Sequence, residues 1–332
     1  MITRHIIPAL LSALLAMGAA GSARAAAETK VTPEIERAVT RGLDYLARTQ
    51  KPDGSWEGSY GNVSGVVGLA MLAFLAHGEQ PDEGKYGHVI RRCVDYIIKN
   101  QQSNGLLATG SSPMYSHGFA TLALGEVYGM IDDPRVGPAL QKATGLTVSS
   151  QNALGGWRYS VGSSDADTTV SGAQMLGLRA AASAGIEVPI SAIQRGVKYY
   201  MSCFCPGGGF GYTGPSGPSM PRAGIGLLVL SLSGAYRAPQ AKATADFILN
   251  GGGTSGYSGY FYYQCYYCSQ AMYQAGGKYW RHWNQTMTPA LISLQQPDGS
   301  WPSGGSGGVV CNTAFALLSL EVNYNLLPIY QR

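Results

Sequence analysis

A short turn motif recurs along the chain at nearly constant spacing, and this repeat limits the fold more than any other feature. The pattern Gln-x3-Gly-x-Trp is complete at 50–56, 151–157 and 295–301. Eroded copies occupy 101–107 and 204–210, and a weaker copy near 250–260 keeps only glycines and tyrosines. A period of about 50 residues is typical of stacked supersecondary units. The chain is therefore expected to be an array of similar hairpins.

A second pattern follows the same period and predicts buried helices. A small residue, three residues, Leu, one residue and then Leu or Phe recur in five of the repeats. The segments around this pattern, such as 66–76 and 225–232, are apolar on every side. Helices that are apolar all round are buried in the interior of a protein. We expect one such inner helix in each repeat.

Amphipathic segments alternate with the apolar ones. They include 35–50, 88–101, 190–201 and 283–294, and the first begins at Thr32-Pro33-Glu34. That triplet offers an N-cap, a proline at the first turn and an acid near the positive end of the helix. These segments predict outer helices with one face toward solvent.

The two helix types predict an all-α fold in which six helical hairpins close into a ring. This architecture is an α/α toroid with six inner and six outer helices, an α6/α6 barrel, and we expect it to occupy 30–332 as a single domain. The glycine of each turn motif permits a sharp reversal, the tryptophan packs between hairpins, and the glutamine bonds exposed backbone at a helix end. These motifs are expected to be structural.

The first 25 residues have the composition of a signal peptide. Arg4 and His5 precede an apolar stretch at 6–20, and Ala23-Arg24-Ala25 has the small-x-small pattern that precedes cleavage. A membrane-spanning helix would need about 20 apolar residues, and this stretch is shorter and contains Pro8. We expect cleavage after Ala25 and export to the bacterial periplasm or the medium. No later segment has the length and apolar character of a transmembrane span.

The charge balance gives little support to polyanionic partners. Loss of Arg4 and Arg24 with the leader reduces 23 basic residues to 21, against 19 acidic ones. Such a balance argues against nucleic acid or an anionic membrane as the main partner. No P-loop, dinucleotide-binding fingerprint or His-Glu-x-x-His motif is present, so no cofactor is expected. The sequence leaves the oligomeric state open.

Six cysteines form an even set in a chain that is expected to be exported. They are Cys93, Cys203, Cys205, Cys265, Cys268 and Cys311. Oxidation is permitted outside the cytosol, so a disulfide is expected somewhere in this set. The alternatives are free buried thiols and a zinc site made from the Cys-x-Cys and Cys-x-x-Cys pairs.

The turn motifs resemble the QW motifs of squalene–hopene and oxidosqualene cyclases, and the hairpin ring resembles the prenyltransferase and squalene oxidase repeat superfamily. The resemblance covers 30–332 and implies the toroid fold. It implies activity less directly, because this fold serves unrelated functions. Protein prenyltransferases of the superfamily bind zinc through an Asp, a Cys and a His, and no matching set maps onto this chain. Export also argues against that activity, since its substrates are cytosolic.

One inner helix begins with a segment similar to the Asp-x-Asp-Asp-Thr-Ala signature of class II terpene cyclases. The segment is Asp165-Ala166-Asp167-Thr168-Thr169, in which a threonine replaces the third aspartate. The resemblance implies that Asp167 donates the proton that starts a carbocation cascade, with Asp165 as its neighbour. A neutral, strongly donating carboxyl group in a dry cavity would be required. The alternative from the residues alone is that one of these aspartates caps the helix.

Other candidates lie at the starts of inner helices in the same register. His117 could assist an acid or serve as a hydrogen-bonded structural histidine. A tyrosine-rich cluster at the fifth inner helix could stabilise a cation or fill the mouth of the barrel. The expected substrate-pocket residues are Tyr115, Thr168, Tyr263, Tyr266, Tyr267, Gln270 and Cys311. With Asp165, Asp167 and His117, they are predicted to converge at one end of the barrel.

Two functions remain open from the sequence. The first is a cyclase-like or isomerase-like enzyme acting on an apolar polyprenoid in the central cavity. The second is a non-catalytic exported toroid that binds a hydrophobic ligand, a glycan or a protein partner.

Overall fold

A computed structural model describes residues 30–108, 112–251, 260–302 and 308–331. The expected signal peptide lies outside these residues. Within them the chain forms twelve α-helices and two short 3-10 helices, and its only β pairing is two isolated bridges. The all-α expectation is therefore confirmed. No helix in the described part of the chain is long and apolar enough to cross a membrane.

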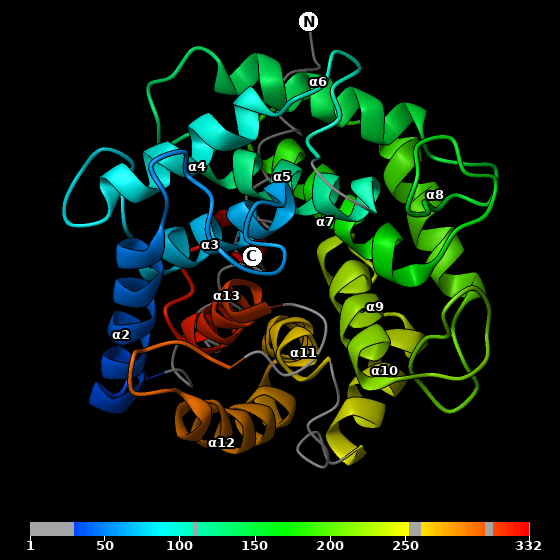
Figure 1. Ribbon diagram of the computed structural model, residues 1–332. Helices are drawn as coiled ribbons and strands as arrows, with labels where there is room; N and C mark the ends of the chain where they lie inside the picture. The colour runs from blue at the N-terminus through cyan, green and yellow to red at the C-terminus, as the bar shows by residue number, and fades with distance from the viewer. Residues whose placement is uncertain (1–29, 109–111, 252–259, 303–307, 332) are drawn as a thin grey trace, which may run out of the picture.

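Six helices form an inner ring around the centre of the molecule (Figure 1). Each contacts the next in chain order, and the last contacts the first, so the ring is closed. They are buried along most of their length, as their apolar sequences predict. The inner helices are α3 (Ser64–His77), α5 (Pro113–Tyr128), α7 (Thr168–Ser183), α9 (Met220–Leu232), α11 (Phe261–Ala275) and α13 (Gly308–Leu320).

Six further helices surround the inner ring and bury one face against it (Figure 1). They are α2 (Pro33–Thr49), α4 (Gly87–Lys99), α6 (Val136–Ser149), α8 (Ile190–Ser202), α10 (Pro239–Asn250) and α12 (Gly277–Leu294). The first of them begins as predicted: Thr32 is the N-cap, its side chain accepts a hydrogen bond from the Ile35 amide, and Pro33 occupies the first turn. The alternation confirms the toroid with six inner and six outer helices.

All three complete turn motifs lie between an outer and an inner helix, as expected. In each motif the glutamine amide donates to the motif's own glycine carbonyl and to a backbone carbonyl of the next outer helix. Gln50 thus reaches Val89 of α4 at 3.1 Å, and Gln151 reaches Ala192 of α8 at 2.9 Å. Gln295 reaches Ala38 of α2 at 2.8 Å, which joins the last hairpin to the first.

The tryptophan and glycine of the motif have equally regular surroundings. The indole of Trp56 donates to the Leu46 carbonyl at 2.9 Å, and Trp157 and Trp301 make the equivalent bond to their own outer helices. Gly54 has φ +92°, and a Cβ there would lie 2.2 Å from the Arg92 carbonyl oxygen. Only glycine fits both the backbone conformation and this close approach.

The chain after α13 closes one end of the barrel. It contains η1 (Glu321–Asn323) and η2 (Pro328–Tyr330). The Tyr330 hydroxyl lies 2.8 Å from that of Tyr266 on α11, and the Tyr330 carbonyl accepts a hydrogen bond from Gln274 at 2.7 Å. A cavity lies at the other end, where the inner helices begin.

Candidate functional site

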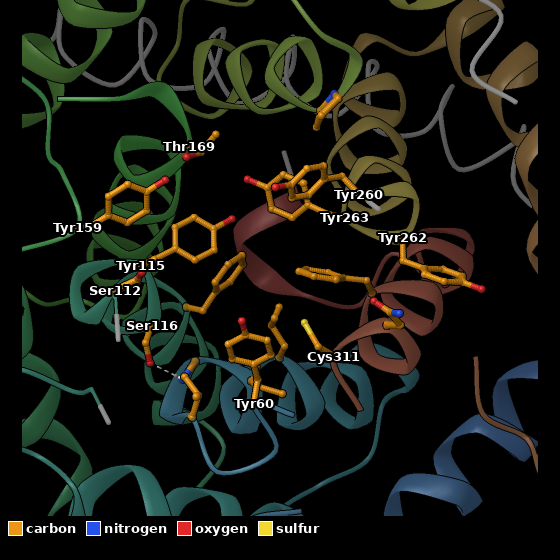
Figure 2. Close-up of a pocket in the computed structure, with 18 of the residues that line it drawn as sticks. Tyr60, Ser112, Tyr115, Ser116, Tyr159, Thr169, Tyr260, Tyr262, Tyr263 and Cys311 are labelled. Carbon is orange, nitrogen blue, oxygen red and sulfur yellow. Dashed lines mark hydrogen bonds between the residues drawn. The ribbon is translucent and has the colours of Figure 1, made fainter. Parts of the chain in front are cut away.

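A cavity of about 520 Å³ lies at the end of the barrel where the inner helices start. Every inner helix contributes lining residues from its first turns or from the loop before it, so parallel helices converge on one site (Figure 2). Volumes of this order accommodate drug-sized molecules. The aromatic lining residues are Tyr60, Tyr115, Phe119, Tyr159, Tyr212, Tyr260, Tyr262, Tyr263 and Phe315.

The remaining lining residues are aliphatic or carry uncharged polar groups, with one exception. They are Val63, Gly65, Val66, Leu69, Ser112, Ser116, Thr169, Pro221, Arg222, Cys311 and Asn312. Arg222 is thus the single charged group in the described lining, and no carboxylate or imidazole lines it. The segments 109–111, 252–259 and 303–307 also contain no Asp, Glu or His in their sequence. A pair of carboxyl groups for acid and base chemistry is absent from the described lining.

The floor of the cavity is a cluster of aromatic rings that crosses the centre of the toroid. Phe119 of α5 and Phe315 of α13 have ring centroids 6.1 Å apart. Tyr266 of α11 lies beneath them, with centroids 6.2 Å from Phe119 and 5.3 Å from Phe315. All three are buried, and Phe119 and Phe315 also line the cavity, so this layer forms its floor.

Backbone strain occurs at the edge of the cavity. Tyr60 and Ser112 both line it and have φ values of 65° and 57°, in the left-handed region that residues with a Cβ rarely adopt. Each precedes an inner helix by a few residues. Such conformations persist where the surrounding structure enforces them, and they cluster at functional sites.

One wall of the cavity rests on Arg158. The hydroxyls of Tyr159 and Tyr212, which both line the cavity, lie 2.7 Å apart. The Arg158 guanidinium carbon lies 5.3 Å and 5.1 Å from the centroids of these two rings. On its other side the guanidinium forms ion pairs with Asp165 at 3.2 Å and Asp167 at 3.3 Å. The two aspartates therefore lie behind the wall.

Asp167 is the N-cap of α7. One carboxylate oxygen accepts hydrogen bonds from the Thr169 amide at 2.8 Å, the Val170 amide at 2.9 Å and the Thr169 hydroxyl. The other oxygen faces Arg158. The Asp167 side chain is fully buried, whereas that of Asp165 is 64% exposed. Neither lines the cavity, and the expected convergence at the cavity does not include them.

His117 is buried on α5 and faces the outer ring. Its Nδ1 accepts a hydrogen bond from the Leu107 amide at 3.0 Å. Its Nε2 therefore carries the proton and donates toward Thr147 Oγ1 at 3.0 Å and the Ala143 carbonyl at 3.2 Å. Burial lowers the pKa of His117 to about 4. His117 does not line the cavity, and its contacts are those of a structural histidine.

The expected pocket residues divide into two groups. Tyr115, Tyr263 and Cys311 line the cavity, whereas Thr168, Tyr266, Tyr267 and Gln270 lie behind its surface. Thr168 donates its hydroxyl proton to the Gly211 carbonyl at 2.8 Å, and Gln270 donates to the Leu318 carbonyl at 3.4 Å. Tyr266 contributes to the floor.

Sequence reasoning missed several lining residues in the loops before the inner helices, including Tyr60, Tyr159, Tyr212 and Arg222. The sequence contains a pattern that marks two of these residues. Tyr159 and Tyr212 each stand two residues after the last aromatic residue of their turn motif, Trp157 and Phe210. An aromatic side chain at that register reaches the mouth of the barrel.

All six cysteines are buried and free, so the expected disulfide is wrong. Cys311 is the one that lines the cavity, and burial raises its pKa to about 12. Among the described residues no group of three or more His, Cys, Asp or Glu side chains is placed to hold a metal ion. The thiols instead behave as small apolar groups in the helix interfaces.

The sequence profile of a family described as "Domain of unknown function (DUF6288)" matches residues 35–223. The chain belongs to this family. The match begins in α2 and runs through the fourth outer helix, α8, to the start of the fourth inner helix, α9.

Curated relatives match the chain only in part. The lanosterol synthase erg7A of Aspergillus fumigatus is 30% identical over 138 residues, which is 37% of this chain and 17% of that protein. Human lanosterol synthase is 34% identical over 74 residues, or 22% of this chain and 10% of that protein. The chain thus matches less than a fifth of the length of either synthase.

Solved structures share the fold across nearly the whole chain. The α-1,6-mannanase GH76A of Salegentibacter superimposes with a TM-score of 0.67 at 8% identity, covering 88% of this chain and 99% of that one. The cellobiose 2-epimerase of Spirochaeta thermophila superimposes with a TM-score of 0.66 at 11% identity, covering 90% and 99%. At such identities the likeness extends to the α/α toroid and not to the site.

Proposed function

We propose that this protein binds a small apolar molecule in the cavity at the open end of the toroid. The observation that carries the proposal is the lining itself: nine aromatic rings and several aliphatic side chains surround about 520 Å³. Burial of apolar surface supplies about 25 cal/mol for each Å² removed from water. A ligand held on all sides by such a wall gains affinity without directed polar contacts.

The lining favours binding over hydrolysis of a glycan. Glycoside hydrolysis generally uses two carboxyl groups on either side of the scissile bond. The described lining offers no carboxyl group, and its one cation is Arg222. The likeness to the mannanase and the epimerase therefore supports the fold of this protein and does not support a shared reaction.

Isothermal titration calorimetry with two probes of different chemistry tests the proposal. Farnesol, a branched apolar alcohol, is expected to bind once per chain, and α-1,6-mannotriose is expected to bind at least tenfold more weakly. Cys311→Trp would place an indole in the cavity and weaken farnesol binding, whereas Cys311→Ala keeps the space open and serves as the matched control. Tight mannotriose binding, or farnesol binding unchanged by Cys311→Trp, would refute the proposal.

A cyclase-like activity on a polyprenoid is the second candidate. Two observations favour it: the partial match to lanosterol synthases, and the buried carboxyl of Asp167, two residues before the lining residue Thr169. The test is to incubate the protein with polyprenols and squalene and to search for cyclised products by mass spectrometry. Products that form with the protein and not with Asp167→Asn would establish this candidate over simple binding.

A further inference from the structure

Three tyrosine hydroxyls meet at the side of the cavity and make no well-formed hydrogen bond within the described part of the protein. Tyr115 comes from α5, and Tyr263 and Tyr267 come from α11, which lies across the ring from α5. The ring centroids of Tyr115 and Tyr263 are 6.4 Å apart, and those of Tyr263 and Tyr267 are 4.9 Å apart. Figure 2 shows the hydroxyls of Tyr115 and Tyr263 directed toward each other inside the cavity.

None of these hydroxyls is satisfied by the described part of the protein. All three oxygen atoms are inaccessible to solvent; they lie close to one another without a well-formed hydrogen bond, and no group outside the cluster pairs with them there. The Tyr267 side chain is fully buried. A buried hydroxyl without a partner costs about 1–3 kcal/mol, and most buried polar groups in proteins are paired. Three unpaired hydroxyls in one cluster beside a cavity indicate a group that the cavity is built to receive.

We propose that Tyr115 and Tyr263 bind the oxygen of an apolar ligand that ends in an uncharged hydroxyl or carbonyl group, with Tyr267 supporting Tyr263 from behind. This inference rests on the proposed function and specifies the ligand class. The rings of the two tyrosines line the cavity and their hydroxyl oxygens lie just behind its surface, so the hydroxyls meet a ligand when the side chains turn toward it. The apolar part of the ligand then lies against Phe119 and Phe315.

The surroundings select against an anionic end group. Burial raises the pKa of Tyr115, Tyr263 and Tyr267, so the three hydroxyls remain protonated donors. The charge of Asp167 adds to that rise for Tyr263. The same loss of water opposes a carboxylate at this point. Arg222 is the one cation in the described lining, and its guanidinium is engaged with the Phe210 and Gly217 carbonyls.

A cationic end group fits less well than an alcohol. An ammonium can only donate, so it would leave the tyrosine hydroxyl protons without an acceptor. An alcohol both accepts and donates, and a ketone accepts two hydrogen bonds through its lone pairs. An uncharged oxygen therefore satisfies the cluster at the smallest desolvation cost.

Four probes that share one C15 chain separate these possibilities: farnesol, α-farnesene, farnesoic acid and farnesylamine. Calorimetry with the full chain at pH 8 is expected to show farnesol binding at least tenfold more tightly than each of the others. Tyr115→Phe and Tyr263→Phe should each weaken farnesol binding about 3- to 10-fold, the effect of one hydrogen bond, and leave farnesene binding unchanged. Tyr236→Phe, which alters an exposed tyrosine outside the cavity lining, is the matched control and should change neither.

The melting temperature of each variant provides an independent readout. Removal of an unpaired buried hydroxyl should leave Tyr115→Phe and Tyr263→Phe as stable as the wild type or slightly more so. Equal affinity for farnesol and farnesene, or preference for the acid or the amine, would overturn this inference while leaving the proposed function in place. Failure of all four probes to bind the wild type would instead count against the proposed function.

Discussion

In three hairpins, the residue directly before the small residue of the inner-helix pattern has the same role. His117, Ser171 and Thr313 accept a hydrogen bond from the backbone amide of the last residue in their turn motif, at 3.0 Å, 2.9 Å and 3.0 Å. The side chains differ, but each ties the turn to the inner helix. This shared role accounts for the position of His117 without a catalytic function.

The sequence could not show which way the polar residues of these first turns point. Asp167 and His117 stand at the cavity end of the barrel by register, yet one caps its helix and the other faces the outer ring. Asp167 accepts hydrogen bonds from the Thr169 and Val170 amides and pairs with Arg158, whereas His117 accepts one from Leu107 and donates to Thr147. The contacts with Arg158, Leu107 and Thr147 are not visible in the local sequence. Tyr115, Tyr263 and Cys311 lie at the starts of inner helices and line the cavity, and their part in binding a substrate stays a prediction.

Substitutions at Asp167 distinguish a helix-capping role from a role as a catalytic acid. Asp167→Asn can still accept hydrogen bonds from the Thr169 and Val170 amides, so thermal unfolding should show a loss of only about 1 kcal/mol. Asp167→Ala should cost about 1–2 kcal/mol, because the cap is lost while Arg158 keeps Asp165 as a partner. Farnesol affinity should not change in either variant. Loss of a measured turnover in a folded Asp167→Asn protein would instead support the acid.

The outer-to-inner turn is the element that makes the hairpins repeat. Its glycine, its glutamine and its tryptophan each contact the same places in successive hairpins, so the motif could be read from the sequence as a structural unit. The period of about 50 residues then gave the number of hairpins. The loops between the motif and the inner helix vary from hairpin to hairpin, which is why Tyr60, Tyr212 and Arg222 could not be assigned to the cavity from the repeat.

Two glycines near one turn provide a matched test of this unit. Gly54 and Gly58 have the same φ of +92°, but a Cβ at Gly58 would meet no atom within 4 Å. Gly58→Ala should therefore cost about 1 kcal/mol, the cost of the left-handed conformation. Gly54→Ala should cost several times as much, because its Cβ would collide with the Arg92 carbonyl. Chemical denaturation measures both, and equal losses would show that the close approach is unimportant.

The whole molecule has one closed and one open end, and buried carboxyl groups lie near the closed one. Glu126 of α5 is 4% exposed and accepts a long hydrogen bond of 3.4 Å from the Ile329 amide. Glu321, in η1, is buried and has no hydrogen-bond partner among the described residues. Burial raises the pKa of Glu126 from 4.5 to about 7, and burial also raises that of Glu321.

Because of these raised pKa values, we expect the protein to be less stable at high pH than at low pH. The folded state holds the Glu126 proton more tightly than the unfolded state, so this stabilisation is complete below about pH 4.5 and is lost as pH rises through 7. The loss from Glu126 should be about 3 kcal/mol. Glu126→Gln should flatten the change in unfolding free energy between pH 5 and pH 8. An unchanged pH dependence in that variant would show that Glu126 does not titrate in this range.

The central claim is that the closed toroid holds an apolar molecule on its aromatic floor, and a crystal structure of the protein grown with farnesol tests it most directly. The account predicts electron density for the ligand above Phe119 and Phe315, with its oxygen within hydrogen-bond distance of Tyr115 or Tyr263. Farnesol found only at another site, with the cavity filled by side chains or water, would contradict the account.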